Sequence, residues 1–339
     1  CMLYLLHRAY KPHIIKKLME LVRMVENQNL EEIKQKRFFQ RERAVGIEQL
    51  RRDKTFIEKS LRIGVELESS NCDIDRLARK FNVRACRGAG NENNFVDISN
   101  GGVAYIYEDG SISPDGAEVV LIGSNESFRD YWDRLEKVEK IIKKDADGEV
   151  SNQSCSCHIT LLTSQERIFP SIYLENFYQL YRKYADAILY LCGSVKEQDT
   201  NRIIRNGIRN YAQPLLLKSP QYHSFENIKL YCPKKTAINF SKQKIVSAFE
   251  LKGIYVEFRV PDRIVIPIAL TSLKCLLQAL LFKAINLSEF GVLNIEDNGV
   301  ENSWEKTKSI VTKITRGTKL GKPTLNYLKN KSLELIDLL

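Results

Sequence analysis

Four segments of the sequence alternate apolar and polar side chains with a period of two, and each places an ionisable residue among its polar positions. Because successive side chains of a β-strand point to opposite faces of the sheet, each segment predicts a strand with one apolar and one polar face. This pattern constrains the fold most, since it predicts a sheet whose polar face gathers charge. The ionisable residues are Glu66 and Glu68 in "IGVELE", Glu118 in "DGSISPDGAEVV", His158 in "SCSCHITL", and Glu257 and Arg259 in "YVEFRV".

Carboxylates that share one face of a sheet repel one another unless a cation lies between them. Mg²⁺ or Mn²⁺ suits an oxygen-rich set of ligands with a single imidazole, because both cations are hard and also hold phosphate oxygens. Arg259 adds a guanidinium that can bind phosphate through two hydrogen bonds. The pattern leaves a second interpretation open, in which the polar face is solvated and Glu257 and Arg259 form a surface ion pair.

The composition is that of an ordinary soluble chain with a basic balance. Of its 339 residues, 43% are hydrophobic, and the formal net charge of +10 favours anionic partners such as nucleotides, nucleic acid, acidic peptides or membrane headgroups. Its eight cysteines are irregularly spaced and no signal peptide precedes them, so we expect a cytoplasmic location. Pro267, Lys274 and Gln278 interrupt the apolar stretch 264–282, which we interpret as a strand end and a buried core helix rather than a membrane span.

The periodicity changes along the chain and predicts an α+β fold. Residues 8–60 have apolar positions at three- and four-residue spacing and dense charge, which predicts amphipathic helices. Short strands and hairpins with Asn-Gly or Asp-Gly turns dominate from residue 64 to about residue 123. Further helices are expected at 125–144, at 171–192, where Tyr173, Phe177, Tyr181 and Tyr184 form a core-packing stripe, and in the basic tail 301–339.

The segments "GVELE", "EDGSISPDGAEVV", "SCHITL" and "YVEFRV", in this order and at these distances, resemble the motifs of the amidoligases. This family belongs to the carboxylate–amine ligase superfamily, together with glutamine synthetase and glutamate–cysteine ligase. The resemblance covers roughly residues 61–285. It implies three segments: an N-terminal helical extension (1–60), an amidoligase-like catalytic domain (61–290) and a C-terminal helical tail (291–339). The catalytic domain would contain a curved antiparallel sheet whose concave face holds two or three divalent cations beneath ATP.

The resemblance also implies roles for individual residues. The chain would form an amide bond between a carboxylate and an amine substrate, an amino acid or a peptide, through an acyl phosphate made from ATP. Arg259 would bind the transferring phosphoryl group, and Glu257 and His158 would take part in catalysis. The implied ligands of Mg²⁺ or Mn²⁺ are Glu66, Glu68, Glu118, His158 and Glu257; Arg205 and Arg209 of "RNGIRN" would bind ATP or substrate, and "AINFS", with Asn239 and Ser241, matches the strand before the Glu-x-Arg strand.

Two departures from the family pattern concern the site. The family motif usually reads Gly-x-His-x-His, whereas this chain has Ser156 at the first position and Thr160 at the last. The stretch between the Glu-x-Glu strand and Asp109 is also longer and more polar than a minimal hairpin, which leaves Glu92 or Asp97 as additional carboxylates near the site. A degenerate member kept for binding remains an alternative to an active ligase.

Parts of the sequence are compatible with functions other than a ligase. Cys155, Cys157 and His158 suggest zinc, but strand alternation turns both cysteines away from the imidazole and no second pair of ligands follows. Cys1 could act as a nucleophile, although processing explains such a chain start equally well. The main alternative is a non-catalytic assembly or nucleic-acid-binding protein that uses the basic terminal helices. Glu is interleaved with the basic residues there, so a protein partner or a homo-oligomer is expected before nucleic acid.

Overall fold

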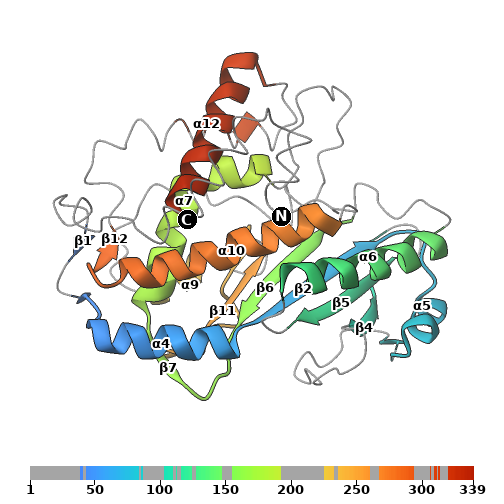
Figure 1. Cartoon of the computed structure of the whole chain (residues 1–339), viewed down its shortest axis with the longest axis horizontal. Helices are drawn as coiled ribbons and strands as arrows, with labels where there is room; N and C mark the ends of the chain where they lie inside the picture. Colours follow the sequence, from blue (N-terminus) through green and yellow to red (C-terminus); the bar gives the residue numbers. More distant parts are fainter. Residues whose placement is uncertain are drawn as a thin grey trace.

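The centre of the protein is an open, seven-stranded sheet (Figure 1). The structure, a computed structural model, describes residues 39–40, 43–83, 85–86, 103–109, 112, 116–123, 127–146, 155–191, 225–232, 236–259, 267–293, 306, 309–310, 312–313 and 320–339. The strands lie in the order β3 (Ala85–Cys86), β4 (Val103–Glu108), β5 (Ala117–Gly123), β2 (Arg62–Ser69), β6 (Cys157–Leu162), β11 (Tyr255–Phe258) and β8 (Ile238–Asn239). All neighbours are antiparallel except β3 and β4, which form a two-residue parallel pair. The predicted α+β class, with an open antiparallel sheet packed by helices, is confirmed.

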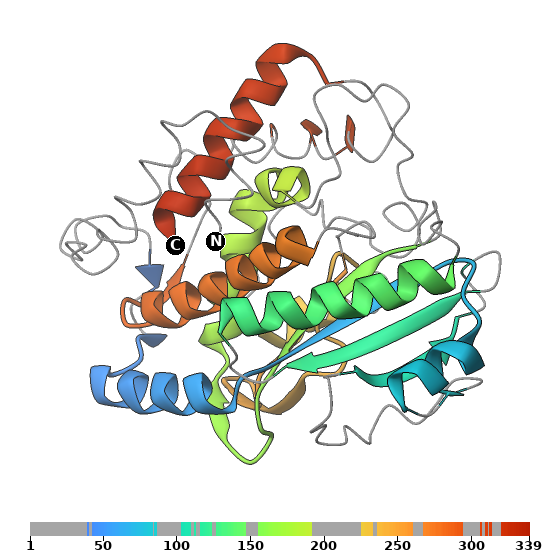
Figure 2. The same cartoon turned by 45° about the vertical axis from the view of Figure 1, so that its right-hand side comes forward.

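Helices cover the apolar face of this sheet. Helices α6 (Phe128–Asp145) and α10 (Pro267–Leu287) cross the same face in both views (Figures 1 and 2), and α7 (Ile172–Leu189) packs against α10. Val65 and Leu67 of β2 are fully buried in one hydrophobic core with Leu135 and Ile142 of α6. The predicted alternation of β2 is therefore confirmed on its apolar side, and its polar side chains point to the opposite face.

Two smaller pairings flank the main sheet. Strands β7 (Ile168–Pro170), β10 (Glu250–Lys252) and β9 (Lys244–Ser247) form a three-stranded sheet, and β1 (Phe39–Gln40) pairs antiparallel with β12 (Val292–Leu293). The prediction of helix throughout 8–60 is wrong at β1, because these residues hydrogen-bond to a strand about 250 positions away, which local periodicity does not reveal. Residues 8–38 lie outside the described residues.

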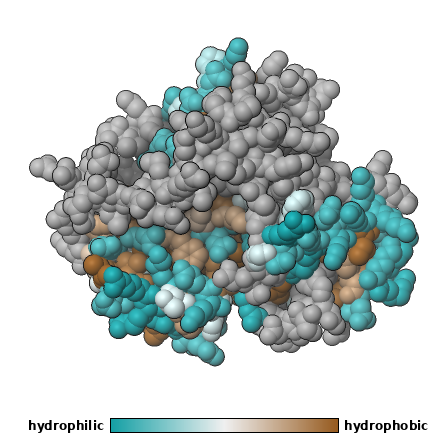
Figure 3. Space-filling model, in the orientation of Figure 1, coloured by the Kyte–Doolittle hydropathy of each residue, from teal (hydrophilic) through white to brown (hydrophobic). Residues whose placement is uncertain are grey.

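Helix α4 (Ile47–Ser60) confirms the helical prediction for the end of that segment. It buries Leu50 and Ile57 in the core, together with Asp53, which accepts hydrogen bonds from Arg167 and Tyr173, and exposes most of its other charged side chains to solvent. Where α4 and α6 lie in Figure 1, the surface in Figure 3 is mostly hydrophilic. Since Ile57 and Val65 belong to one core, α4 packs directly on the sheet domain; the domain boundary at residue 60 stays a prediction.

Helix α5 (Ile74–Phe81) was not predicted, because the turn signals of this region indicated that short strands and turns dominate it. The side chain of Asp73 caps it by accepting a hydrogen bond from the backbone N–H of Arg76 at 2.9 Å. At its other end Asn82 adopts a left-handed conformation with a φ of 52°. Asp145, at the end of α6, holds α5 in place through an ion pair of 2.5 Å with the Arg76 guanidinium.

The aromatic stripe on α7 is core, as predicted: Tyr173, Phe177, Tyr181 and Tyr184 are all buried. Helix α7 departs from helical geometry at Tyr184, whose hydroxyl donates to Glu334 of α12 (Lys322–Leu338) at 2.8 Å. Nearby, Lys331 and Asp186 form a buried ion pair of 3.0 Å between α12 and α7. Short helix α9 (Phe225–Tyr231) also contacts α7.

Helix α10 confirms the interpretation of the apolar stretch as a core helix. Leu273, Leu277 and Leu281 are buried in the same core as the sheet. Among the described residues, Leu270–Leu287 is long and apolar enough to cross a membrane by length and composition, and 67% of this window is buried inside the protein. The packing accounts for its hydropathy.

A candidate site for divalent cations and phosphate

Strand register brings the predicted residues together on the face of the sheet opposite the core. Glu66 of β2 pairs with His158 of β6, and Glu68 of β2 pairs with Glu118 of β5. Glu257 of β11 lies one strand beyond β6. Antiparallel partners on one face lie close enough for their side chains to meet, so six carboxylate, imidazole and guanidinium side chains converge although their strands are far apart in sequence. These residues are Glu66, Glu68, Glu118, His158, Glu257 and Arg259.

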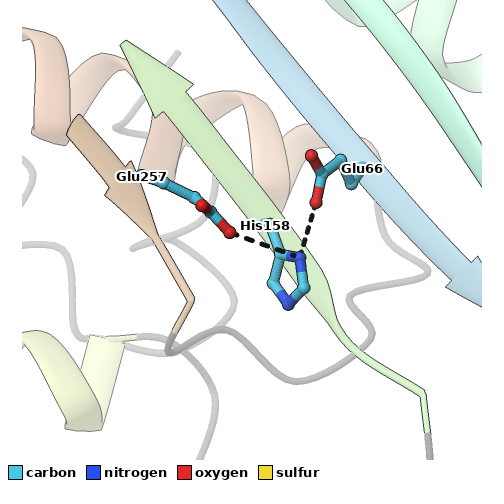
Figure 4. A group of neighbouring side chains, drawn as sticks. All are labelled: Glu66, His158 and Glu257. Atoms are coloured by element: carbon cyan, nitrogen blue, oxygen red, sulfur yellow. Dashed lines mark hydrogen bonds and ion pairs between the residues drawn. The ribbon is translucent and has the colours of Figure 1, made fainter. Parts of the chain in front are cut away.

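His158 lies between two carboxylates in the first group of candidate ligands (Figure 4). Its Nδ1 atom is 2.6 Å from Oε2 of Glu66 and 3.9 Å from Oε1 of Glu257. Ligand atoms of these three residues all lie within 4.8 Å of one another. His158 and Glu257 are buried, whereas Glu66 is partly exposed, so the group can be reached from solvent.

A second group of candidate ligands adjoins the first and consists of Glu68, Asp109 and Glu118, again with ligand atoms within 4.8 Å of one another. The Nε2 atom of His158 is 3.4 Å from Oε1 of Glu68, so the imidazole lies between the two groups. Ser156 places its Oγ atom 3.1 Å from the same nitrogen. Each ring nitrogen thus faces a different group of carboxylates.

Asp109 is the member of this group that sequence reasoning did not name as a ligand. It follows β4 and opens the turn of the β4–β5 hairpin, where its backbone N–H donates to the carbonyl of Gly116 at 3.2 Å. The turn is tight, because a Cβ atom at Gly116 would lie 2.2 Å from the Cβ of Ile112. The signal was present in "EDGSISPDGAE": a turn of this kind brings Asp109 beside Glu118 across the hairpin.

Both oxygens of the Glu257 carboxylate are held by neighbouring side chains. Asn239 of β8 donates from Nδ2 to Oε2 of Glu257 at 2.6 Å. The Nη1 atom of Arg259 donates to Oε1. Glu257 therefore has a defined orientation, and Arg259 lies beside the first group of ligands, as the sequence predicted.

The crowding of charge changes the protonation of the site. Burial is the largest cause that raises the pKa of Glu118 well above its usual value, and the charges of Glu66 and Glu68 raise it further. Burial alone would lower the pKa of Arg259, but the carboxylates of Glu257 and Glu66 outweigh it, so the net shift is upward and the guanidinium stays charged.

The ligands match hard divalent cations rather than zinc. Carboxylate oxygens dominate both groups and a single imidazole completes them, which is the set of donors that Mg²⁺ and Mn²⁺ accept. Cys155 and Cys157 are buried, and Cys157 belongs to the hydrophobic core on the other face of β6. Among the described residues, neither cysteine belongs to a group of candidate ligands.

Some predicted residues cannot be placed. Arg205 and Arg209, Glu92 and Asp97, and Cys1 lie outside the described residues. Ser241 is described, and its backbone N–H donates to Oδ1 of Asn239 at 2.8 Å. The convergence of the other predicted residues is observed, while their roles as ligands and phosphate contacts stay predictions.

Comparison with known proteins finds similarity to solved structures. No protein-family model matches the sequence, and no curated protein matches it either. The structure is similar to a bifunctional glutathione synthetase from Pasteurella multocida, with a TM-score of 0.38 and 12% sequence identity. The similarity covers 87% of this chain and 49% of that enzyme, so the chain spans about half its length. A similarity at this level transfers neither fold nor activity, and the side chains of the site carry the functional evidence.

Proposed function

We propose that the protein is an ATP-dependent carboxylate–amine ligase. The observation that carries this proposal is the pair of adjoining ligand groups, Glu66–His158–Glu257 and Glu68–Asp109–Glu118, with a charged guanidinium beside them. Carboxylates from separate strands gathered on one face suit a site whose ligands are cations and phosphate oxygens. The resemblance of the four strand segments to amidoligase motifs points to the same chemistry.

Divalent cations bound by these groups would neutralise the phosphate oxygens of ATP that must approach a substrate carboxylate. Glu66, His158 and Glu257 would hold one cation, and Glu68, Asp109 and Glu118 a second. Because Glu118 has a raised pKa, it must release its proton before it can act as an anionic ligand. Cation binding by the second group would therefore release a proton from Glu118.

Arg259 would stabilise the charge that develops on the phosphoryl group in transfer. A carboxylate is a poor acyl donor, so an oxygen of the substrate carboxylate attacks the γ-phosphorus of ATP, which gives an acyl phosphate and ADP. The amine then attacks the acyl carbon, loses a proton and displaces phosphate, which gives the amide. The position of Arg259 against Glu257, at the edge of the first ligand group, supports a role in the first of these steps.

An activity screen tests this proposal directly. The protein is incubated with ATP, Mg²⁺ or Mn²⁺ and pools of amino acids and short peptides, and the release of phosphate is measured. Mass spectrometry of the pools that release phosphate then searches for a product whose mass is that of its two precursors minus one water. Glu66→Ala and Arg259→Ala should abolish the activity. Glu175→Gln is a matched control, because Glu175 is also a buried carboxylate with an arginine partner, at 2.7 Å from Arg43, but lies outside both ligand groups.

The result that would contradict the proposal is equally specific. A folded protein that neither binds ATP in the presence of these cations nor releases phosphate with any pool is not a ligase of this class. The identity of the acid and of the amine, the use of a protein partner or a homo-oligomer, and the cytoplasmic location stay predictions in either case.

A further inference from the structure

Asn239 contacts Glu257 in a way that the sequence did not predict. Its Nδ2 atom lies 2.6 Å from Oε2 of Glu257, and the two residues are register partners on neighbouring strands β8 and β11. Both side chains are buried. A hydrogen bond from a neutral amide to a buried carboxylate is charge-assisted and is protected from competition by water.

The orientation of the Asn239 amide is fixed by a second contact. Its Oδ1 atom accepts a hydrogen bond from the backbone N–H of Ser241 at 2.8 Å, in the turn that follows β8. Because Oδ1 is the acceptor in that contact, the amide group must present Nδ2, its donor, to Glu257. The turn therefore determines which atom faces the carboxylate.

The hydrogen bond from Asn239 determines which oxygen of the Glu257 carboxylate Arg259 binds. A guanidinium can bind both oxygens of a carboxylate at once in a planar, bidentate pair. In the structure Asn239 holds Oε2, and Arg259 bonds to Oε1, the oxygen that lies 3.9 Å from Nδ1 of His158. Without Asn239, rotation of the carboxylate into a bidentate pair with Arg259 would move Oε1 away from His158 and Glu66.

We propose that Asn239 is a positioning residue that holds Glu257 in the orientation required by the first ligand group. This inference rests on the proposed function, since it assumes that Glu66, His158 and Glu257 bind a divalent cation. Asn239 does not touch the cation; it acts through Glu257. Outer partners of this kind change the metal affinity of a site about 10- to 100-fold when they are removed.

Mn²⁺ titration followed by electron paramagnetic resonance tests the inference without any need for the substrates. Asn239→Ala should weaken Mn²⁺ binding about tenfold. In a double-mutant cycle with Glu257→Gln, the Asn239 substitution should change the affinity less than about twofold, because its target is gone. Thr160→Val is the matched control: Thr160 is the buried register partner of Glu257 on the other side, and its replacement should leave the affinity unchanged.

A second variant separates positioning from a structural role in the turn. Asn239→Ser keeps an oxygen that can accept from the Ser241 N–H, but its side chain is too short to donate to Glu257. Asn239→Ser should therefore bind Mn²⁺ as weakly as Asn239→Ala. Its melting temperature should lie closer to that of the wild type than the melting temperature of Asn239→Ala does. If Asn239→Ser binds Mn²⁺ with wild-type affinity, or if Asn239→Ala lowers the affinity equally with and without Glu257→Gln, the inference alone is overturned. If the wild-type protein binds no Mn²⁺, the proposed function is overturned together with it.

Discussion

The Nδ1 atom of His158 lies 2.6 Å from Oε2 of Glu66, its register partner on the adjacent strand. The ring is buried, and its other nitrogen faces Glu68 at 3.4 Å. Each nitrogen of the ring thus lies beside a carboxylate of a different ligand group, and the Oγ atom of Ser156 also lies 3.1 Å from Nε2. The role of His158 is therefore inseparable from the state of the two ligand groups.

The first prediction concerns this imidazole. His158→Asn should weaken Mn²⁺ binding by at least about tenfold, because even the loss of an outer partner of a ligand costs that much. Calorimetric titration with Mn²⁺ measures the change. Ser156→Ala is the comparison variant: it removes the hydroxyl that lies 3.1 Å from Nε2 but no ligand, so its effect should be smaller. Equal affinities of His158→Asn and wild type would exclude the imidazole as a ligand.

The raised pKa of Glu118 predicts a pH dependence of stability when no divalent cation is present. Between its ordinary value of 4.5 and its raised value, the folded state binds more protons than the unfolded state. The free energy of unfolding contributed by this group is therefore largest below pH 4.5 and falls as the pH rises through the raised pKa. Glu118→Gln should flatten this part of the profile, measured by urea unfolding with a chelator present, and an unchanged slope in the variant would show that another group is responsible.

The buried ion pair between α12 and α7 predicts that removal of one partner destabilises the protein more than replacement of both partners by apolar residues. Asp186→Ala leaves Lys331 buried without its carboxylate and should destabilise the protein by about 3–5 kcal/mol. Burial already lowers the pKa of Lys331, and the loss of Asp186 would lower it further. Replacement of both residues, Lys331→Met with Asp186→Leu, should cost much less than Asp186→Ala. Urea unfolding of the wild type and both variants measures these effects, and a double variant as unstable as Asp186→Ala would contradict the expectation.

The turn at Gly116 predicts a local effect on the second ligand group. Gly116→Ala places a Cβ atom 2.2 Å from that of Ile112, so the turn that carries Asp109 must shift, at a cost of about 1–3 kcal/mol. If Glu68, Asp109 and Glu118 bind a cation as proposed, that cation should bind more weakly as a result, which Mn²⁺ titration would detect. Gly64→Ala is the control, because its Cβ would make only an ordinary contact of 3.7 Å with Thr160. A Gly116→Ala protein with normal stability would show that the turn adapts freely.

Much of the site followed from alternation along strands. Glu66 and Glu68 share a face because they are two residues apart, and the apolar partners Val65 and Leu67 identify which face is the core. Alternation also separated Cys157 from His158 correctly. It could not show that Glu66 pairs with His158, since register between distant strands depends on the whole sheet.

The elements that were missed depend on short or distant contacts. Helix α5 has a clear cap at Asp73, but its eight residues were hidden in a region of turn signals, and its position depends on Asp145 of α6. Strand β1 exists through its pairing with β12. Asp109 and Asn239 entered the site because a hairpin turn and a neighbouring strand, respectively, bring them beside carboxylates that the sequence did identify.

The first ligand group draws its three members from β2, β6 and β11, whose positions in the chain are separated by about ninety or a hundred residues each. No fragment of the protein that lacks one of these strands can gather the group. Because a ligand that binds only the native state stabilises it by mass action, a cation bound by this group as proposed would raise the fraction of folded protein. Its removal would then lower the amount of folded protein as well as the proposed activity.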